Sequence, residues 1–504
     1  MLLRQRAVAS VAVALAMGGL AGCSSNPGVP CNRGGDVCPV LPSSSGAARA
    51  DFDGDGLADL AVGIPGRDVG GVIDAGAVVV FWGSLDGLGK GHAATVIDET
   101  LPGLPRPPAA GDLFGTSLAA GDFDGDGRGD LAVGAPGENG RRGAVAVLRS
   151  RSAGTGPASF ALERVVTKDG LGLHAAAGDA FGSALLWAQL GRGPQADLVI
   201  GAPGDDTDAT NAGTAFVLYG SAAGLDPSTV QRLSMHGRPQ PQAQFGEALA
   251  AGDFDGDGHV DLAVGAPLGD TDEPCGPGCT KHVVGAGFVT IVPGGTDALS
   301  PDTTTEVTAG GVLGGSRLPA AKAQYGTSLA AGDIDGDGRA DLAIGGPVET
   351  VARHAVAGAV VISMTRGPGR FLAAGEGLPD RPVDRAFLGT ALAMNDLDGD
   401  GRADLVIGAP RAGRGEVFVV SASGTREIAP EQLGANPPAA ALFGSALSTW
   451  NVVDGPPADL VVGAPGGDEV FVLEGRSLSS VGELTEASAG LPTQTGDLFG
   501  ATLY

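Results

Sequence analysis

The sequence predicts an all-β fold, a seven-bladed β-propeller closed by pairing of the N- and C-terminal strands. Three observations support this prediction. One repeat occurs in seven copies, the composition suits strands joined by tight turns, and the incomplete repeats at the two ends of the sequence complement each other.

The repeat is anchored on the pair Asp-Leu. Each pair leads into an apolar strand that ends at a Gly-x-Pro turn, and a second apolar strand such as GAVVVF at 76–81 follows. Phe-Gly or a close variant, such as Phe114-Gly115, precedes the pair. The seven pairs begin at Asp59, Asp130, Asp197, Asp261, Asp341, Asp404 and Asp459.

The two ends of the repeat array are out of phase. The first copy starts at Asp51 with no Phe-Gly strand before it, whereas Phe499-Gly500 near the end has no acidic loop after it. Pairing the ends in one blade would remove exposed strand edges. An open solenoid would instead predict atypical polar caps. The sequence therefore predicts a ring closed by strands from both ends.

The composition fits this architecture and excludes one class of function. The 504 residues include 88 glycines but only 4 % aromatic residues, so the core must consist of Ala, Val, Leu and Ile on strands. The net charge is -27, and most of the acidic excess lies in five short loops. Because there is no basic stripe, we expect no nucleic-acid partner.

Five copies carry the motif D-x-D-G-D-G-x-x-D. Tight coiling of such a loop brings carboxylates at positions 1, 3, 5 and 9 to one point, and glycines relieve its steric cost. An all-oxygen shell, completed by the carbonyl of position 7, suits calcium, and about five ions are expected. The predicted ligands are Asp51, Asp53, Asp55, Leu57, Asp59; Asp122, Asp124, Asp126, Arg128, Asp130; Asp253, Asp255, Asp257, His259, Asp261; Asp333, Asp335, Asp337, Arg339, Asp341; and Asp396, Asp398, Asp400, Arg402, Asp404.

The EF-hand shares the first six positions of this motif but requires a glutamate at position 12 and flanking helices. Here position 12 is always Val or Ile, which indicates that the loop runs into a strand. Copies three and seven lack the early aspartates. We expect those two blades to be free of metal, with Trp187 and Trp450 packing where the other blades have their loops.

The first 50 residues predict export and a lipid anchor. Arg4 and Arg6 precede an apolar run too short for a transmembrane span, as in a signal peptide. The sequence LAGC at 20–23 resembles a bacterial lipobox, which implies cleavage after residue 22 and lipidation of Cys23. Residues 23–50 are rich in Ser, Pro and Gly and predict a flexible tether, followed by the propeller at 51–504. The expected location is the bacterial cell envelope, at the outer membrane or cell surface.

The other four cysteines form two pairs that are local in sequence, Cys31 with Cys38 and Cys275 with Cys279. Two disulfides are expected in an oxidising compartment, although four cysteines allow three connectivities. A metal site at Cys275 and Cys279 is the competing interpretation. The intervening Gly-Pro-Gly favours a tight cystine loop.

Taken together, Phe-Gly, the aspartate loop and Gly-Ala-Pro resemble the FG-GAP repeat of the integrin alpha-subunit propeller. The resemblance covers residues 51–504. It implies that the aspartate loops lie on the lower face and that ligands meet loops of the opposite face. The longest such loop, 268–285, contains Cys275 and Cys279, and the loop at 204–211 is strongly acidic. Five aspartate loops exceed the number usual in integrins.

The sequence favours a binding protein over an enzyme. It has no HExxH motif, no G-x-S-x-G motif and only six scattered histidines. The predicted function is calcium-dependent recognition or adhesion at the cell surface, with a protein, polysaccharide or matrix ligand. The alternatives are a hydrolase or lyase with a site on a propeller face, and a purely structural envelope protein.

Overall fold

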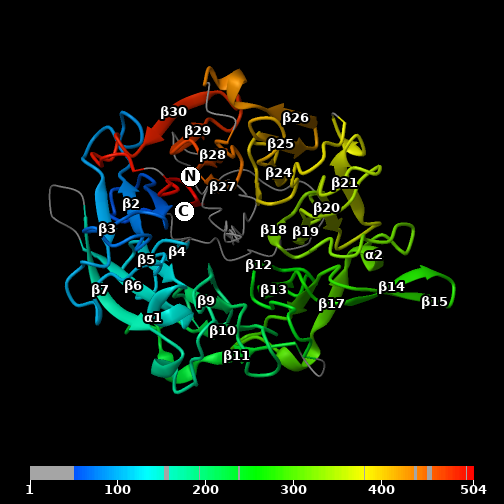
Figure 1. The fold of residues 1–504 in the computed structure, drawn as a ribbon, viewed down its shortest axis with the longest axis horizontal. Helices are drawn as coiled ribbons and strands as arrows, with labels where there is room; N and C mark the ends of the chain where they lie inside the picture. The colour runs from blue at the N-terminus through cyan, green and yellow to red at the C-terminus, as the bar shows by residue number, and fades with distance from the viewer. Residues whose placement is uncertain are drawn as a thin grey trace, which may run out of the picture.

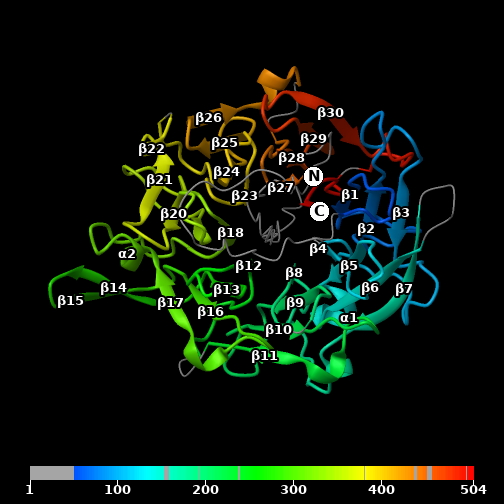
Figure 2. The ribbon, with the colours of Figure 1, turned by 180° about the vertical axis from the view of Figure 1, so that it is seen from behind.

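The computed structural model describes residues 50–151, 158–191, 193–235, 239–379, 381–435, 440–450, 457–494 and 496–504. Seven sheets are arranged as blades around a central axis, as Figures 1 and 2 show from the two faces. This arrangement confirms the predicted seven-bladed β-propeller. Among the described residues, no helix is long and apolar enough to cross a membrane.

The four main strands of each blade pair in antiparallel order, and in blades 2 to 7 the innermost strand precedes the Asp-Leu pair. Blade 1 contains β31 (Thr502–Leu503), β1 (Leu60–Ile64), β2 (Ala77–Phe81) and β3 (Thr95–Asp98); blade 2 contains β4 (Ser117–Gly121), β5 (Asp130–Ala135), β6 (Ala144–Arg151) and β7 (Ser159–Val166); blade 3 contains β8 (Ala184–Ala188), β9 (Asp197–Ala202), β10 (Thr214–Leu218) and β11 (Gln231–Leu233); blade 4 contains β12 (Leu249–Gly252), β13 (Asp261–Ala266), β16 (Phe288–Val292) and β17 (Thr305–Thr308).

The remaining blades follow the same plan, with a short fifth strand in blade 5. Blade 5 contains β18 (Ser328–Gly332), β19 (Asp341–Gly346), β20 (Ala359–Ser363), β21 (Arg370–Ala374) and β22 (Gly377–Leu378); blade 6 contains β23 (Leu392–Asn395), β24 (Asp404–Ala409), β25 (Glu416–Ser421) and β26 (Gly424–Ile428); blade 7 contains β27 (Ala446–Trp450), β28 (Asp459–Ala464), β29 (Glu469–Leu473) and β30 (Ser480–Thr485). Two one-turn helices, α1 (Glu138–Arg141) and α2 (Ala309–Val312), and four 3-10 turns, Asp169–Leu171, Pro227–Thr229, Pro301–Thr303 and Pro430–Leu433, lie between strands.

Blade 1 closes the ring with strands from both ends of the array. Strand β31 pairs with β1 in antiparallel register, so that Val62 lies opposite Leu503 and Gly63 opposite Thr502. The blue start and the red end of the described repeat array lie side by side in Figures 1 and 2. The incomplete repeats at the two ends of the array therefore complete one blade between them, as predicted.

The glycines of the repeat make the blades fit together. In blade 2, the amide of Gly115 donates to the carbonyl of Gly134 at 3.0 Å. A Cβ atom on Gly134 would lie 2.2 Å from the carbonyl oxygen of Gly182 in blade 3, which leaves no room for a side chain. Gly115 has a φ of +91°, a conformation that favours glycine. Phe-Gly and Gly-x-Pro are thus contact points within and between blades.

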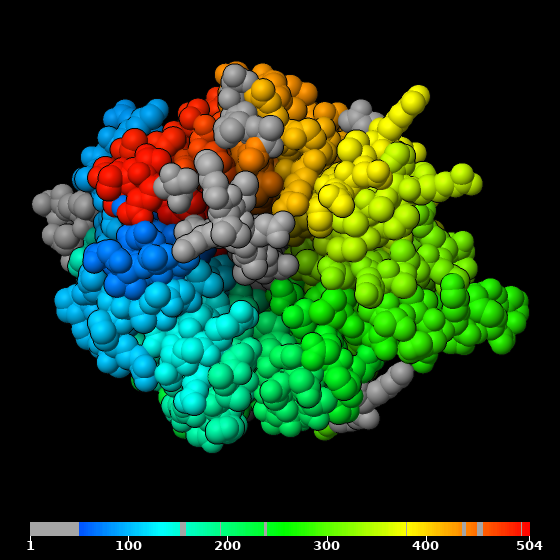
Figure 3. Space-filling model, viewed as in Figure 1, coloured from blue at the N-terminus to red at the C-terminus, as the bar shows by residue number. Residues whose placement is uncertain are grey.

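The long loop of blade 4 forms a β-hairpin of strands β14 (Thr271–Gly276) and β15 (Cys279–Val283). A disulfide between Cys275 and Cys279 closes its tip, which confirms the predicted pairing. The hairpin projects outward from the perimeter of the ring, as Figure 3 shows, rather than over the central axis. Cys23, Cys31 and Cys38 lie outside the described residues.

Candidate metal centres

The five aspartate loops share one backbone conformation, which is held by the carboxylate of position 1. In every loop this carboxylate accepts hydrogen bonds from the amides of the glycines at positions 4 and 6. The distances are 2.6–2.7 Å to position 4 and 2.8–3.0 Å to position 6. Both glycines have positive φ, for example +77° at Gly54 and +89° at Gly56. The motif therefore folds each loop around its first aspartate.

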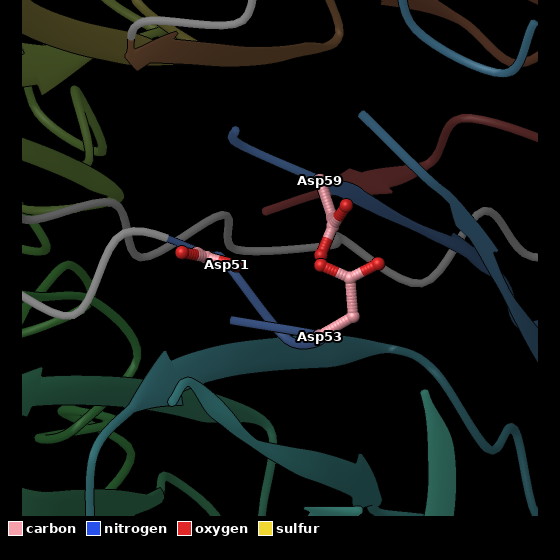
Figure 4. Close-up of side chains that lie close together, drawn as sticks. All are labelled: Asp51, Asp53 and Asp59. Carbon is pink, nitrogen blue, oxygen red and sulfur yellow. The ribbon is translucent and has the colours of Figure 1, made fainter. Parts of the chain in front are cut away.

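This conformation brings the carboxylates of positions 1, 3 and 9 together. In four loops, one oxygen atom from each of these three aspartates lies within 4.8 Å of the others. Figure 4 shows the first loop, in which the carboxylates of Asp53 and Asp59 face each other. The four clusters are Asp51, Asp53, Asp59; Asp122, Asp124, Asp130; Asp253, Asp255, Asp261; and Asp333, Asp335, Asp341. The fifth loop has the same hydrogen bonds from Gly399 and Gly401 to Asp396.

The aspartates of position 5 make a different contact. The backbone amide of position 7 donates to this carboxylate in all five loops, at 2.8–3.0 Å. In the second loop, Arg128 at position 7 also forms an ion pair with Asp126 at 2.6 Å. The three-carboxylate groups consist of positions 1, 3 and 9, while in the first loop the Asp55 carboxylate of position 5 also acts on Asp53, so its predicted role as a ligand stays a prediction.

Position 9 is buried, and its carboxylate connects two parts of the blade. Asp59 is fully buried, and its two oxygens accept hydrogen bonds from the amides of Phe52 and Gly83 at 2.7 and 2.8 Å. Asp197 in blade 3 makes the equivalent bonds to Leu190 and Gly220, both at 2.7 Å, although its loop lacks the other aspartates. This role explains why all seven copies keep the aspartate.

Burial and neighbouring charge make the metal-free clusters unfavourable. Burial, with smaller contributions from the charges of Asp53 and Asp51, raises the pKa of Asp59 to about 8 despite its backbone hydrogen bonds. Burial likewise raises the pKa of Asp130 and Asp404 to about 7 and that of Asp341 to about 6. Among the described residues, Oδ2 of Asp130 and Oδ1 of Asp404 are buried without a hydrogen-bond partner.

These features fit a hard divalent cation. The donor atoms are all carboxylate oxygens, buried oxygens are left without partners, and a positive ion would offset the burial and the repulsion that raise the pKa values. Positions 1, 3 and 9 are the residues best placed to hold such an ion. When bound, it would supply charge neutralisation and cross-link the two ends of the loop.

Copies three and seven differ from the prediction in one respect. Trp187 and Trp450 lie within the innermost strands β8 and β27, not in place of the loops. The ring of Trp450 packs edge-on against Tyr504, with centroids 5.7 Å apart. These tryptophans therefore contribute to packing near the ring closure rather than filling a loop position.

Sequence reasoning missed a second type of acidic cluster. Glu99, Asp112 and Glu138 come together at the boundary between blades 1 and 2, each offering an oxygen within 4.8 Å of the others. They belong to three separate segments and follow no repeated local spacing. A comparison of the residues that follow Gly-x-Pro-Gly in different copies could have drawn attention to Glu138.

Comparison with known proteins agrees with the repeat structure. The FG-GAP repeat model matches residues 44–81, 114–148, 245–292, 325–363 and 388–420, the copies that carry the aspartate loops. The chain therefore contains five FG-GAP repeats within its β-propeller, and it is similar to integrin alpha subunits. It is 32 % identical to integrin alpha-PS2 of Drosophila melanogaster over 256 residues, which is 47 % of this chain and 16 % of that protein.

A second group of relatives consists of phospholipases and not of integrin subunits. The chain is 34 % identical to phosphatidylinositol-glycan-specific phospholipase D of Rattus norvegicus over 187 residues, which is 37 % of this chain and 20 % of that protein. The chain thus matches only about a fifth or less of the length of these relatives. Apo AztD from Citrobacter koseri superimposes with a TM-score of 0.44 at 10 % identity, over 88 % of this chain and 97 % of that chain, and this likeness carries no functional argument.

Proposed function

We propose that the protein is a calcium-stabilised recognition module exposed on the outside of the cell, which binds a protein, polysaccharide or matrix ligand. The observation that carries the proposal is the joint occurrence of an integrin-alpha-like FG-GAP propeller and five aspartate loops of one conformation. Calcium would stabilise the loops on one face and leave the rest of the surface available for binding.

The disulfide-closed hairpin β14–β15 is our candidate contact element. It projects from the ring, and four of the five residues of β15 are exposed. Its base is held rigidly because Glu273 is fully buried and accepts hydrogen bonds from the hydroxyls of Thr271 and Thr308 at 2.9 and 2.7 Å. A rigid base under an exposed tip suits recognition with a small loss of conformational entropy.

The proposal is tested with the purified propeller on arrays of glycans and extracellular matrix proteins, with calcium and with chelator. We expect saturable binding to one ligand class that is lost in chelator. A double variant with Lys281→Ala and His282→Ala at the hairpin should weaken binding. The matched control, Lys90→Ala with His92→Ala, alters the same residue types at an exposed loop of blade 1 and should not. Absence of binding by folded, calcium-loaded protein on every array would contradict the proposal.

The N-terminal segment would tether this module to the bacterial envelope through lipidated Cys23, as its lipobox-like sequence suggests. Metabolic labelling with a tagged fatty acid tests this part of the proposal. Label should enter the wild-type protein and be absent from a Cys23→Ala variant. Equal labelling of the two would contradict lipidation at Cys23.

A second candidate function is hydrolysis at a propeller face, which the similarity to phospholipase D motivates. The matched segment covers only a fifth of that protein, so the similarity by itself does not carry over its activity. Assay of the purified chain against phosphatidylinositol-glycan substrates distinguishes the two candidates. Turnover that survives purification to homogeneity would favour the hydrolase.

A further inference from the structure

Three boundaries between blades are built alike. At each boundary, one residue comes one or two positions after the outermost strand of the first blade. The second is the aspartate two positions before the Phe-Gly that leads into the next blade. The third is the residue directly after the Gly-x-Pro-Gly turn of that next blade. We call each set a junction triad. The triads are Glu486, Asp497, Arg67 between blades 7 and 1; Glu99, Asp112, Glu138 between blades 1 and 2; and Lys168, Asp179, Asp205 between blades 2 and 3.

The backbone confirms that the three triads are equivalent. The glycine of Gly-x-Pro-Gly donates its amide hydrogen to the carbonyl of the triad aspartate in each case. These bonds are Gly66 to Asp497 at 2.9 Å, Gly137 to Asp112 at 3.0 Å and Gly204 to Asp179 at 3.1 Å. The three sites can therefore be compared residue by residue.

Two of the triads contain their own cation. Arg67 pairs with Glu486 at 2.6 Å and with Asp497 at 3.3 Å. Lys168 pairs with Asp179 at 2.7 Å and with Asp205 at 2.8 Å, and all three of these side chains are nearly inaccessible. In both triads one buried positive charge lies between two buried carboxylates. Hydrogen bonds from Lys168, Thr207 and Thr214 outweigh the effect of burial and lower the pKa of Asp205.

The triad between blades 1 and 2 has three carboxylates and no cation of its own. Glu99 is 8 % exposed and Asp112 is 2 % exposed. Among the described residues, Oε2 of Glu99 is buried without a hydrogen-bond partner; Oδ1 of Asp179 and of Asp497 also lack one, but the other oxygen of each of these two carboxylates pairs with a buried cation. In the part of the chain that the structure describes, the one ion pair at this triad joins Arg106 to Glu138 at 3.5 Å, and the Arg106 side chain is 57 % exposed. Two buried carboxylates therefore remain uncompensated.

We propose that Glu99, Asp112 and Glu138 bind a divalent cation, with calcium as the ion that the donor set favours. The three carboxylate oxygens lie within 4.8 Å of one another, about twice the distance from calcium to an oxygen ligand of about 2.4 Å. A divalent ion would leave one net negative charge on the triad. That is the same charge that Arg67 and Lys168 leave on the other two triads.

Counting only the three carboxylates and leaving out the exposed Arg106, a single amine or guanidinium group from a partner would leave two negative charges, one more than a divalent ion. The site also has an entry path, because Glu99, Arg106 and Glu138 line a cavity of about 210 Å³ that could hold water ligands of the ion. Asn139 and Thr167 offer further oxygen atoms on its wall.

This site is separate from the aspartate loops. Glu138 follows β5 at its C-terminal end, whereas the loop that contains Asp122 and Asp124 precedes the same strand at its N-terminal end. The two ion sites would therefore lie at opposite ends of blade 2, on opposite faces of the propeller ring. Binding at the junction triad would join blade 1 to blade 2, and it does not depend on occupancy of the loops.

The competing explanation is that a proton, and not a metal ion, neutralises the buried carboxylates of this triad. Burial and the nearby charge of Asp112 raise the pKa of Glu99 well above its ordinary value, so that the triad could be neutralised by protonation of Glu99. In that case no ion would bind, and the triad would be stable only in its protonated form. The experiment must therefore count bound ions rather than measure stability alone.

The decisive variant is Glu138→Arg, which gives this triad the arginine of Gly-Ile-Pro-Gly-Arg at 63–67. Bound calcium is counted by equilibrium dialysis and atomic emission at free calcium of about 1 mM, within the range for extracellular sites. We expect the variant to bind one ion fewer than the wild type and to be at least as stable in chelator. Glu99→Gln should likewise lose one ion, and its fold is checked by circular dichroism.

The matched control is Asp205→Asn, which alters the triad of Lys168 and should leave the count unchanged. If the aspartate loops bind no calcium, the wild type should still bind one ion and Glu138→Arg none, so failure of the loops and failure of this site are distinguishable. Equal counts for the wild type, Glu138→Arg and Glu99→Gln would overturn the proposal and favour the proton.

Discussion

Ala61 and Tyr504 exchange two backbone hydrogen bonds, at 2.7 and 2.8 Å, and thereby join the two ends of the repeat array. The hydroxyl of Tyr504 also donates to the carbonyl of Ala120 in blade 2, at 2.7 Å. Tyr504, which follows the closing strand β31, thus contacts both blade 1 and blade 2. The strand contributes buried side chains as well as hydrogen bonds, since Leu503 is 1 % exposed.

Shortening Leu503 should therefore weaken the closure. We expect Leu503→Ala to lower the free energy of unfolding by about 2–5 kcal/mol, because it removes buried methyl groups and leaves a cavity. Urea unfolding followed by circular dichroism measures the change. The control is Leu85→Ala, whose side chain is 92 % exposed and should change stability by less than about 0.5 kcal/mol. Equal effects of the two substitutions would contradict a closure that depends on β31.

Substitution of the aspartate at position 3 should have opposite effects on stability with and without calcium. Burial and the charges of Asp55 and Asp51 raise the pKa of Asp53, so that Asp53→Asn relieves repulsion in the metal-free protein. In chelator the variant should melt at the same temperature as the wild type or higher. With calcium at about 100 times its Kd, the variant should lose up to about 2.7 kcal/mol of ion-dependent stabilisation.

Differential scanning calorimetry in both buffers tests this prediction, with Asp86→Asn in an exposed loop as the control. A loss of stability in chelator, or an unchanged response to calcium, would show that Asp53 is a structural residue and not a ligand.

Position 9 should behave differently, because its carboxylate holds backbone amides even where no other loop aspartate is present. Asp197→Ala leaves the buried amides of Leu190 and Gly220 without an acceptor. We expect a loss of about 2–4 kcal/mol, of similar size in calcium and in chelator, since an unsatisfied buried donor costs about 1–3 kcal/mol. Chemical denaturation in both buffers measures the loss, and the exposed Asp302→Ala serves as control. A loss seen only with calcium would contradict this role.

Much of the fold could be predicted from the sequence because the propeller repeats one local pattern. The phase difference between the first copy and Phe499 predicted the closure, and the spacing of Asp51, Asp53 and Asp59 predicted their convergence. These inferences succeeded because the residues involved are close in sequence or recur at the same place in several copies.

Other features could not be predicted, because they depend on contacts between segments that are distant in the sequence. The two amides bound by Asp197 belong to Leu190 in the loop before β9 and to Gly220 just after β10, so the local spacing of copy three did not reveal this role. The junction triad of Glu99, Asp112 and Glu138 is assembled across two blades. The hairpin β14–β15 points outward, as Figure 2 shows from behind, and this direction likewise depends on how blade 4 packs.

The stability of the metal-free protein should fall as pH rises, which is the reverse of the usual effect of aspartates. Burial raises the pKa of Asp59 to about 8 and of Asp130 and Asp404 to about 7, against an ordinary value of 3.8. Between 3.8 and these values the folded state binds more protons than the unfolded state. In chelator, stability should therefore be present in mild acid and be lost as pH rises through about 7–8.

Calcium should reverse this trend, because it binds the deprotonated carboxylates and competes with protons for them. Melting temperatures measured at several pH values between about 5.5 and 8.5 should be nearly equal with calcium and with chelator in mild acid, and the difference between them should widen as pH rises. Asp59→Asn removes one raised carboxyl and should flatten the chelator curve, whereas Asp86→Asn should not. Stability that rises with pH in chelator would mean that the loops are held as ionised carboxylates without metal, and the assignment of positions 1, 3 and 9 as an ion site would lose its electrostatic basis.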